Sequence, residues 1–478
     1  MLIRHTGFYL LARGIPAVIA FLSLVLYTRL LTPEQYGLYA MVFSAMNIVN
    51  AIFFQWLNLS FGRFYMMFDD HGASLFPVTL RAFYWLLGIT AVGTVVVVSV
   101  RQFAAPNLYV WAALTLAWAQ AWFDLNLKIA NVRLSPLHYG MLSISKNVLS
   151  LGMGLGLFYF VGFDGLFAGI ATGTVITTAV LSRRNWGETL RFPKADYALL
   201  RRLLGYGLPI ASSAVLILVV DVSDRFFIAW YLGAESVGLY SATYDLVQQG
   251  IGMPAIIIGL AALPLIVHAL EKEGVVAAQQ RLKEKAALLL LVTIPIIVSF
   301  SMLAHNIAQV VLGEKFRAVS KDLMPIISLG IFLGCMKMYY YDLSFQLGRK
   351  TLGLIWAGVA ALVNVGLNIL WVPVFGIMGA AYATLCAFAV AVFLSRLMGR
   401  RLFPLPSLVQ EGYKIVLAAG GMALAYSAIA KWTGLWALVG QLVIGYLVYG
   451  FFIIFLDVGK CREKIFFYLG GGANGEKI

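Results

Sequence analysis

Polar and apolar positions along this chain fall into long blocks, and each apolar block is long enough to form a membrane-crossing helix. An α-helix needs roughly 20 apolar residues to span a bilayer. The blocks predict spans at 8–30, 37–61, 76–100, 107–127, 138–160, 164–182, 207–231, 238–264, 286–311, 322–347, 351–372, 376–398, 413–431 and 434–456. We therefore predict an all-α polytopic membrane protein with about 14 transmembrane helices. Charged residues weaken the blocks at 107–127 and 322–347.

Composition supports a chain that uses lipid as its solvent. Of the 478 residues, 61% are hydrophobic and 12% are charged. Soluble chains are nearer half apolar and a quarter charged. A membrane β-barrel is excluded because its strands would alternate polar and apolar residues. The net charge of +14 would suggest nucleic acid in a soluble protein, but here the positive-inside rule accounts for it. We expect membrane lipid as a partner and no nucleic acid.

The distribution of Lys and Arg between loops predicts the orientation in the membrane. With the N-terminus inside, the inside segments hold 24 Lys and Arg residues and the outside loops hold 5. Basic loops face the cytoplasm, so both termini are predicted to be cytoplasmic. The first apolar block lacks a small-residue cleavage site and is interpreted as a span rather than a signal peptide.

Two pairs of similar segments indicate an internal duplication. Gly-Leu-Tyr opens a span at 37–39 and again at 238–240, each time after a short acidic outside turn. Gly162–Gly165 and Gly376–Gly379 also open spans, and both of those spans end in Leu-Ser-Arg. Both pairs keep their place within a six-span unit, so the repeats are parallel, as transporter halves often are.

The duplication predicts four parts of the chain. These are an N-terminal six-helix lobe at 1–200, a C-terminal six-helix lobe at 201–400, two additional transmembrane helices at 401–456 and a cytoplasmic tail at 457–478. We expect the two lobes to be related by a pseudo-twofold axis. Gly152 and Gly156 in the fifth span are expected to allow close packing of helices.

Six cations lie within the predicted spans, where each costs roughly 2.5–3.5 kcal/mol at a helix centre. They are Arg13, Arg29, Arg81, Lys146, Arg225 and Lys337. Arg29 and Arg81 are near span ends, where a long side chain can reach the headgroups. For Arg13, a side chain that reaches the headgroups and a side chain that lines a cavity remain equal alternatives. Lys146, Arg225 and Lys337 lie deeper and predict a wet cavity or a partner.

Polar residues accompany these cations. Asp221 and Asp224 share the span of Arg225, either neutralising it or holding it for an anion. Other polar side chains fall on helix faces: Asn47 and Asn50 in the second span, and Tyr240, Tyr244, Asp245 and Gln248 in the eighth. Each stripe alone fits hydrogen bonding between helices. Together they predict an aqueous cavity lined mainly by the first two spans of each lobe.

Motifs for enzymatic chemistry are missing from the sequence. There is no Walker-type loop, no nucleophile elbow and no grouping of the five scattered histidines that would suggest a metal site. The outside loops are short. We therefore predict a protein that is not an enzyme, with no catalytic residues, no metal and no cofactor.

Two stretches resemble polysaccharide-export flippases of the Wzx type, which belong to the multidrug/oligosaccharidyl-lipid/polysaccharide exporter superfamily. The first runs from Leu26 to Tyr39 and reaches Gly62–Tyr65, and its counterpart is Asp224–Ile228 with the later Gly-Leu-Tyr. The arrangement of six, six and two spans matches as well. The resemblance implies two lobes with alternating access, and a function as a flippase in the bacterial inner membrane that serves surface polysaccharide biosynthesis.

The resemblance also implies a substrate and part of its site. The substrate would be a polyprenyl diphosphate carrying a short sugar chain, and polysaccharide polymerase or assembly proteins would be partners. Arginines of the first and seventh spans tend to line a cationic cavity in such families, which carries over to Arg13 and Arg225. The predicted roles of Lys146 and Lys337 are not implied by the resemblance and depend only on the depth of these residues within their spans. H⁺, Na⁺ and downstream polymerisation all stay open as driving forces.

Four alternatives remain. A cation-coupled multidrug exporter of the same superfamily would use an embedded acid, for which Asp221, Asp224 and Asp245 are candidates. A lipid II flippase would share the chemistry and differ in the sugar. A membrane-embedded glycosyltransferase, polymerase or ligase is disfavoured by the short outside loops. A scaffold without transport activity would have no need of buried cations.

Overall fold

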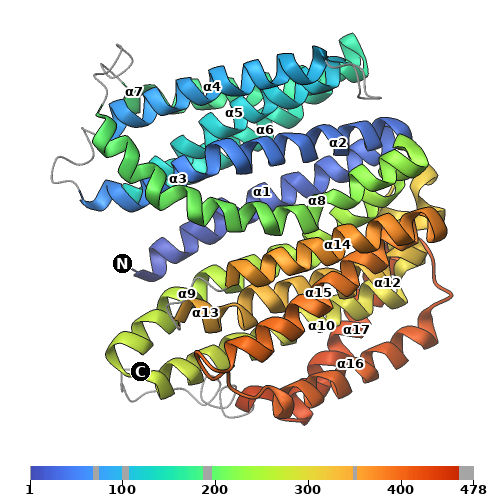
Figure 1. Ribbon diagram of the computed structural model, residues 1–478. Helices are drawn as coiled ribbons and strands as arrows, with labels where there is room; N and C mark the ends of the chain where they lie inside the picture. The colour runs from blue at the N-terminus through green and yellow to red at the C-terminus, as the bar shows by residue number, and fades with distance from the viewer. Residues whose placement is uncertain (1, 68–74, 100–106, 187–195, 348–352, 462–478) are drawn as a thin grey trace. The chain divides into compact units, whose positions relative to one another are not determined.

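The computed structural model describes residues 2–67, 75–99, 107–186, 196–347 and 353–461. Every secondary-structure element in these ranges is a helix, which confirms the all-α prediction (Figure 1). The first part of the chain forms α1 (Leu2–Leu30), α2 (Pro33–Val49), η1 (Asn50–Phe54), α3 (Gln55–Phe64), η2 (Tyr65–Met67), α4 (Leu75–Ser99), α5 (Asn107–Val132), α6 (Pro136–Val161), α7 (Phe163–Trp186) and α8 (Tyr197–Val247).

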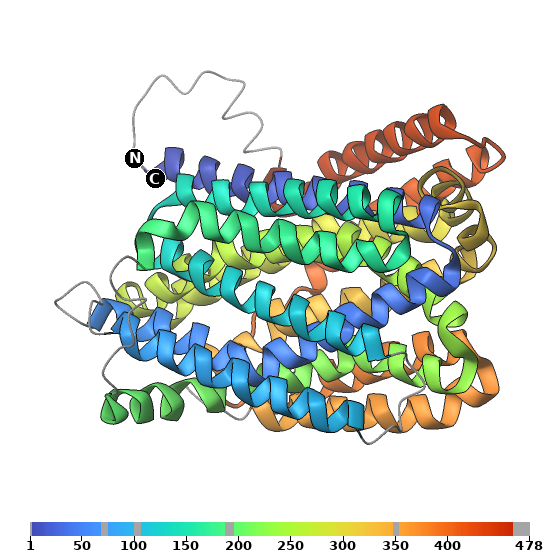
Figure 2. The same ribbon diagram turned by 90° about the horizontal axis from the view of Figure 1, so that it is seen from above.

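The second part continues in the same way. It forms η4 (Gln248–Gly252), α9 (Met253–Lys272), α10 (Val275–Met302), α11 (Ala304–Val311), α12 (Glu314–Met336), η5 (Lys337–Tyr341), α13 (Leu343–Leu347), α14 (Gly353–Phe375), α15 (Ile377–Gly399), α16 (Val409–Ile429), α17 (Leu435–Phe455) and η6 (Val458–Lys460). Within each part, the long helices run side by side in both views (Figures 1 and 2).

Contacts divide the chain into two compact units. Unit 1 comprises Met1–Tyr27 and Leu31–Ser241, and unit 2 comprises Thr28–Leu30 and Ala242–Ile478. The end of α8 therefore passes from one unit to the other. The sequence places its division at residue 200, following the repeat rather than the contacts, and those four parts stay a prediction.

Eleven helical stretches among the residues that the structure describes are long and apolar enough to cross a membrane. One of them, Tyr197–Lys272, has Gly233 in a non-helical conformation (φ 83°) and so covers the predicted seventh and eighth spans. Helix α5 carries Asp124 and Lys128 and is not among the eleven. A polytopic membrane protein is confirmed, whereas the count of fourteen stays a prediction.

Helix α2 begins at a capping box that the sequence encodes. The Thr32 hydroxyl accepts a hydrogen bond from the Gln35 backbone N–H at 3.2 Å, and the Gln35 side chain accepts one from the Thr32 N–H at 3.1 Å. Pro33 occupies the first helical turn, where its missing N–H costs nothing. The turn before Gly-Leu-Tyr is thereby fixed by local chemistry.

The two Gly-Leu-Tyr segments contact each other reciprocally within unit 1. A Cβ on Gly37 would lie 1.8 Å from the Ala234 carbonyl oxygen, and a Cβ on Gly238 would lie 1.8 Å from that of Pro33. Pro33 and Ala234 each stand four residues before their glycine. A local two-fold axis between the two glycines produces such a pattern, so the first repeated pair has a structural counterpart.

The second repeated pair is also preserved in structure. Gly162 and Gly376 have positive φ values of 90° and 62°. Each N–H donates to the carbonyl oxygen four residues earlier at 2.9 Å, and each Gly carbonyl oxygen accepts from the glycine three residues later, Gly165 or Gly379. A side chain on either of those two glycines would strike the carbonyl of the preceding helix. The sequence repeat therefore encodes the same helix–turn–helix unit twice.

The close contact between α6 and α7 depends on glycines other than the expected pair. A Cβ on Gly152 or Gly156 would meet nothing within 4 Å, so the predicted role of these residues is wrong. Instead, Gly169 and Gly173 of α7 lie against the backbone of α6, where an added Cβ would come within 2.3 Å and 2.7 Å of the nearest α6 atom. Spacing alone does not show which face of a glycine-rich helix meets a neighbour.

Helices α16 and α17 are fastened to the rest of unit 2 by buried polar contacts. Ser299 and Tyr426 share a hydroxyl–hydroxyl bond of 3.0 Å, and the Asn306 amide donates to Gln441 at 2.7 Å. Because lipid offers no hydrogen-bond partners, these two contacts hold the added helices in place.

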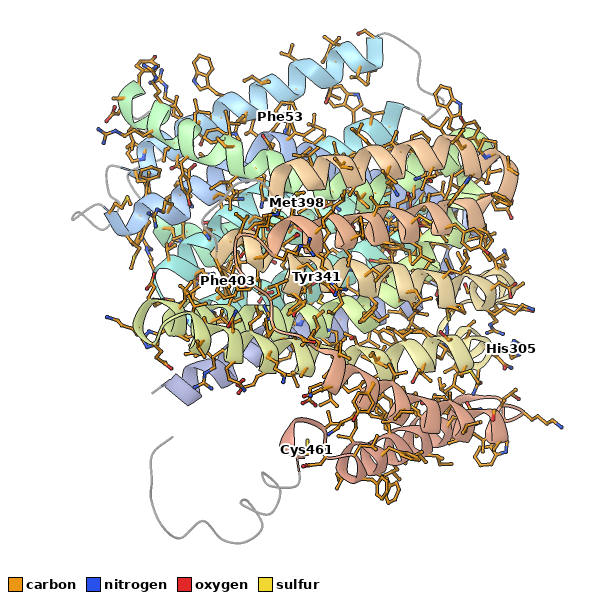
Figure 3. All side chains as sticks on the ribbon, turned by 60° about the horizontal axis from the view of Figure 1, so that its bottom comes forward. Phe53, His305, Tyr341, Met398, Phe403 and Cys461 are labelled. Atoms are coloured by element: carbon orange, nitrogen blue, oxygen red, sulfur yellow. The ribbon has the colours of Figure 1, made fainter. Side chains whose placement is uncertain are left out.

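His305, next to Asn306, lies at one end of this unit, far from Tyr341 and Phe403 (Figure 3).

Replacing Gly37 by leucine should destabilise the protein, because the added side chain would meet the Ala234 backbone rather than a flexible side chain. Overpacking of this kind costs about 1–3 kcal/mol. Thermal unfolding in detergent, followed by size-exclusion chromatography, should show a clear fall in melting temperature. Gly156→Leu is the matched control, since a Cβ there meets open space. Equal melting temperatures for the two variants would contradict the reciprocal contact.

Candidate functional site

Arg225, the predicted anion-binding residue, lies in α8 and reaches across to α2. Its side chain is 8% exposed. Its Nη1 donates a hydrogen bond to the Ser44 hydroxyl at 3.1 Å. Ser44 in turn donates to the Ala40 carbonyl oxygen of its own helix at 2.7 Å. The guanidinium is therefore enclosed by protein and uses a neutral hydroxyl as one of its partners.

Asp224 stands beside Arg225 in sequence but meets a different neighbour. It is 1% exposed, and the Tyr240 hydroxyl donates to its Oδ2 at 2.7 Å. Adjacent helical side chains point about 100° apart, so the acid and the arginine can each bind a separate group. Tyr240 belongs to the second Gly-Leu-Tyr segment, which thereby contributes both to helix packing and to this group. Asp221, one turn earlier, is half-buried.

Lys146 forms a second, half-buried group in unit 1, joining α6 to α5. Its Nζ donates to Gln120 Oε1 at 2.8 Å and lies 5.0 Å from the centre of the Phe123 ring. The Gln120 amide then donates to Asp124 Oδ1 at 2.8 Å. Asn50, from the π-helical segment η1, also hydrogen-bonds Asp124. The Asp124 carboxylate thus compensates the charge of Lys146 through the Gln120 amide, which lies between them.

Lys337 belongs to unit 2 and is 5% exposed. Its Nζ lies 2.6 Å from Asp342 Oδ2, and the Ser395 hydroxyl donates to Asp342 Oδ1 at 2.9 Å. The ion pair lies at the two ends of the π-helical segment η5, and the hydrogen bond from Ser395 connects it to α15. π-Helical insertions are frequent at functional sites, and this one leaves a neutral, fully engaged ion pair.

The remaining predicted site residues are dispersed. Arg13 lies in α1, but its side chain is outside the described residues. Asn47 of α2 is exposed. Tyr244 is buried, Asp245 is half-buried and Gln248 is exposed, all in unit 2. The structure therefore gathers two separate groups in unit 1, around Arg225 and Lys146, and one ion pair in unit 2.

Two cations near span ends meet other groups of the protein. Arg29 is exposed and donates to the Val310 carbonyl oxygen at 2.9 Å, and its reach to the headgroups stays a prediction. Lys285, counted with an inside loop, is 4% exposed in α10, and its Nζ lies 5.8 Å from the centre of the Tyr339 ring. Helix α10 begins ten residues before Lys285. The charged stretch before the predicted span is therefore helix and not loop.

Sequence reasoning missed the acceptors of Lys146. Gln120 and Asp124 are four residues apart, so they share a face of the otherwise apolar α5. That spacing was the available signal, and it lay in a span weakened by charge. Among the residues that the structure describes, no three His, Cys, Asp or Glu side chains gather as metal ligands.

The chemistry available to the Arg225 group is anion recognition. An arginine stays charged and can bind a phosphate or carboxylate through two parallel hydrogen bonds. A serine hydroxyl is a neutral and weaker acceptor. An incoming dianion could compete with Ser44 for Arg225, whereas the Lys337–Asp342 ion pair would have to be broken before Lys337 could bind an anion.

Two comparisons of the sequence with known proteins point to the same class of protein. Residues 26–321 match the family described as Polysaccharide biosynthesis protein. A relative from Shigella flexneri named "Putative O-antigen transporter" is 21% identical over 396 residues, which cover 80% of this chain and 93% of the relative.

Solved structures resemble this fold over most of its length. The lipid II flippase MurJ in an inward closed conformation matches with a TM-score of 0.78 and 16% identity, covering 96% of this chain and 99% of that one. An inward-facing multidrug resistance transporter of the MATE family matches with a TM-score of 0.63 and 17% identity, covering 83% and 94%. At such identities the likeness shows the fold.

Replacing Asp342 by asparagine should destabilise unit 2, because it leaves the buried Lys337 ammonium without its carboxylate. Breaking a buried ion pair costs about 3 kcal/mol or more. The double variant Lys337→Met with Asp342→Asn removes the charge as well and should recover much of the loss. Melting temperatures in detergent give the comparison. A double variant no more stable than the single one would contradict this account of the pair.

Proposed function

The chain belongs to the polysaccharide biosynthesis protein family, and from this premise we propose that it is a flippase for lipid-linked oligosaccharide. It moves a polyprenyl-diphosphate-linked oligosaccharide from the cytoplasmic to the outer leaflet, for surface polysaccharide biosynthesis. The relative named as an O-antigen transporter supports this substrate class. The observation that carries the proposal is the buried Arg225, with Ser44 as a resting partner in a helical bundle.

The physical problem of such transport is the charged diphosphate. A phosphate group that leaves water for low dielectric needs charged donors in place of its hydration shell. Arg225 supplies them, and Asp224 holds the nearby Tyr240 hydroxyl, which can turn toward a sugar. The prenyl tail has no need to leave the lipid. The protein thus replaces water around the headgroup only.

In this mechanism the headgroup binds while its site is open to the cytoplasm, and the protein then opens toward the outside by alternating access. Arg225 exchanges Ser44 for a phosphate oxygen on binding and returns to Ser44 on release. Arg13 and Lys146 are proposed as further cations for the diphosphate, with Asn47 and Asn50 near the sugars. Such differential contacts are what allow a ligand to shift a conformational equilibrium.

We propose that the protein lies in the bacterial inner membrane, as its resemblance to polysaccharide-export flippases implies. Its basic loops support an orientation with both termini in the cytoplasm. It acts as a transporter and not as an enzyme, consistent with its named relatives. Polysaccharide polymerase and assembly proteins are proposed partners, since they consume the delivered chain. The lipid II flippase alternative differs only in the sugar.

Arg225→Ala should abolish leaflet transfer without unfolding the protein. Charge-assisted hydrogen bonds contribute roughly 1.5–3 kcal/mol each, so the initial rate should fall at least about tenfold. The assay uses proteoliposomes loaded with a polyprenyl-diphosphate oligosaccharide, and it scores the sugar that becomes accessible in the opposite leaflet.

Two further variants separate binding from folding. Arg401→Ala removes an exposed cation and should transfer normally. Ser44→Ala removes only the resting partner and should retain transfer. If folded Arg225→Ala transfers at the wild-type rate, Arg225 has no role in transport. If folded wild-type protein transfers none of several sugars, the flippase proposal fails and the multidrug-exporter alternative is tested next.

A further inference from the structure

Helix α4 carries a stripe of residues, half-buried at Arg81 and exposed beyond it, that the transport site does not use. Arg81, Trp85, Gly88 and Val92 follow at steps of four, three and four residues, so they share one face. Trp85 is 62% exposed and Val92 is 65% exposed. The stripe therefore faces outward from unit 1 and begins with a cation.

The opposite face of α4 fixes the direction of this stripe. Leu80 and Phe83 are buried, and the Phe83 ring packs 5.4 Å from that of Phe54 and 5.2 Å from that of Trp122. The buried Thr90 hydroxyl accepts a hydrogen bond from the Trp118 indole at 2.9 Å. Because the opposite face is held by packing, the stripe cannot turn into the interior of unit 1.

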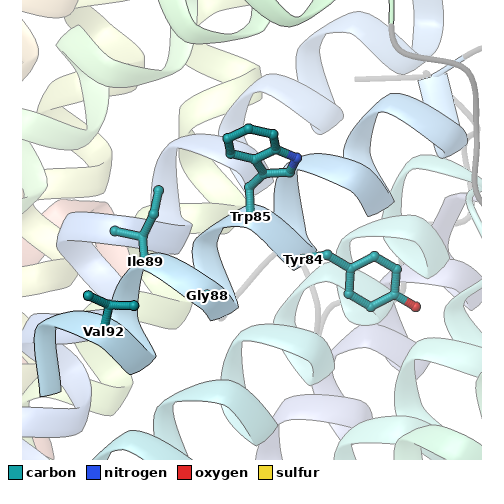
Figure 4. Close-up of a pocket in the computed structure, with 5 residues that line it drawn as sticks. All are labelled: Tyr84, Trp85, Gly88, Ile89 and Val92. Carbon is teal, nitrogen blue, oxygen red and sulfur yellow. The ribbon is translucent and has the colours of Figure 1, made fainter. Parts of the chain in front are cut away.

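The stripe contains a shallow groove at Gly88. It is lined by Tyr84, Trp85, Gly88, Ile89 and Val92. Figure 4 shows the Tyr84 and Trp85 side chains diverging on one side of Gly88, with Ile89 and Val92 on the other. A Cβ on Gly88 would meet nothing within 4 Å, so the glycine leaves a notch rather than a packing contact.

A positive charge lies at one end of the groove. The Arg81 guanidinium stacks 5.9 Å from the centre of the Tyr197 ring at the start of α8. An arginine stacked on a ring presents its N–H groups in the plane of the guanidinium, where they can meet phosphate. Arg81 lies in the inner part of the predicted third span. It is thus placed for headgroups of the cytoplasmic leaflet.

From this geometry we propose that the α4 stripe docks the lipid carrier of the substrate. Arg81 binds the phosphate next to the prenyl chain, and the groove at Gly88 takes the first isoprene units. A prenyl chain carries methyl branches, which suit a notch between bulky side chains better than a smooth acyl chain does. The distance from Arg81 to Val92 is about 16 Å along the helix, enough for several isoprene units. This inference rests on the proposed flippase function.

The role of the stripe is to raise the affinity for the carrier before transfer. A tail held by α4 keeps the headgroup near the protein, so the headgroup binds as a tethered ligand at raised effective concentration. Loss of the stripe should therefore raise the KM for the lipid-linked substrate and leave kcat close to that of the wild type. A residue that contacts the headgroup during crossing, such as Arg225, should instead lower kcat.

The test measures binding of undecaprenyl diphosphate without sugar to the purified full chain by native mass spectrometry. Gly88→Leu fills the notch, and Arg81→Gln removes the charge. Each should weaken binding about tenfold, given the strength of charge-assisted bonds and of buried apolar contacts. Gly93→Leu is the matched control, because Gly93 is also exposed on α4 but points about 140° away. Trp85→Ala gives an independent measure of the groove if Gly88→Leu is poorly folded.

Each outcome decides the inference. Weaker binding in the stripe variants, unchanged binding in Gly93→Leu and a raised KM in leaflet transfer support it. Equal binding in all variants overturns it. Equally strong competition by phosphatidylglycerol also overturns it, because the groove is then a general site for acidic phospholipid. Wild-type protein that transfers oligosaccharide while the variants bind normally leaves the flippase function standing without the α4 stripe.

Discussion

The close approach of two backbones at Gly37 and Gly238 constrains how α2 and α8 pack in unit 1. It brings the start of α2 against the second part of α8, with no side chain between them. Further along α2, Ser44 accepts a hydrogen bond from Arg225, which lies in the first part of α8, before Gly233. Helix α2 therefore contacts both parts of α8, through residues 181 positions apart in the case of Ser44 and Arg225.

Buried charge is handled by a common rule at each cation that the structure encloses. The membrane interior offers no water, so each charge must find a partner within the protein. Lys337 has a direct carboxylate, and Lys146 reaches one through Gln120. Arg225 has a neutral hydroxyl among its partners. Compensation of the charge therefore takes a different form at each of these cations.

The duplicated architecture preserves backbone geometry more closely than chemistry. Gly162 and Gly376 form the same turn with the same hydrogen bonds. The segments η1 and η4 each interrupt the helix that opens with Gly-Leu-Tyr. The side chains on this frame differ: Lys337 of unit 2 meets the Asp342 carboxylate five residues later in the chain, whereas Arg225 of unit 1 reaches the Ser44 hydroxyl on another helix. The duplication therefore fixes the course of the backbone and leaves the polar contacts of each unit to its own side chains.

Much of the fold could be predicted from the sequence because the signals are local. Apolar blocks predicted the helices, Thr32-Pro33-Glu34-Gln35 encoded a capping box, and repeated glycine turns indicated duplication. The hydropathy pattern alone also predicted that cations within the spans need a partner or a wet cavity. These features need only residues close in the chain, where periodicity and capping act.

The sequence by itself determined that this protein is a bundle of membrane helices with a repeated frame and cations inside it. The tertiary structure decided which neighbours the cations meet: Ser44 is among the partners of Arg225, Gln120 accepts from Lys146, and the Tyr339 ring lies beside Lys285. The physical reason is that hydropathy reports the solvent around a helix. The neighbour that a side chain meets depends on how distant helices pack.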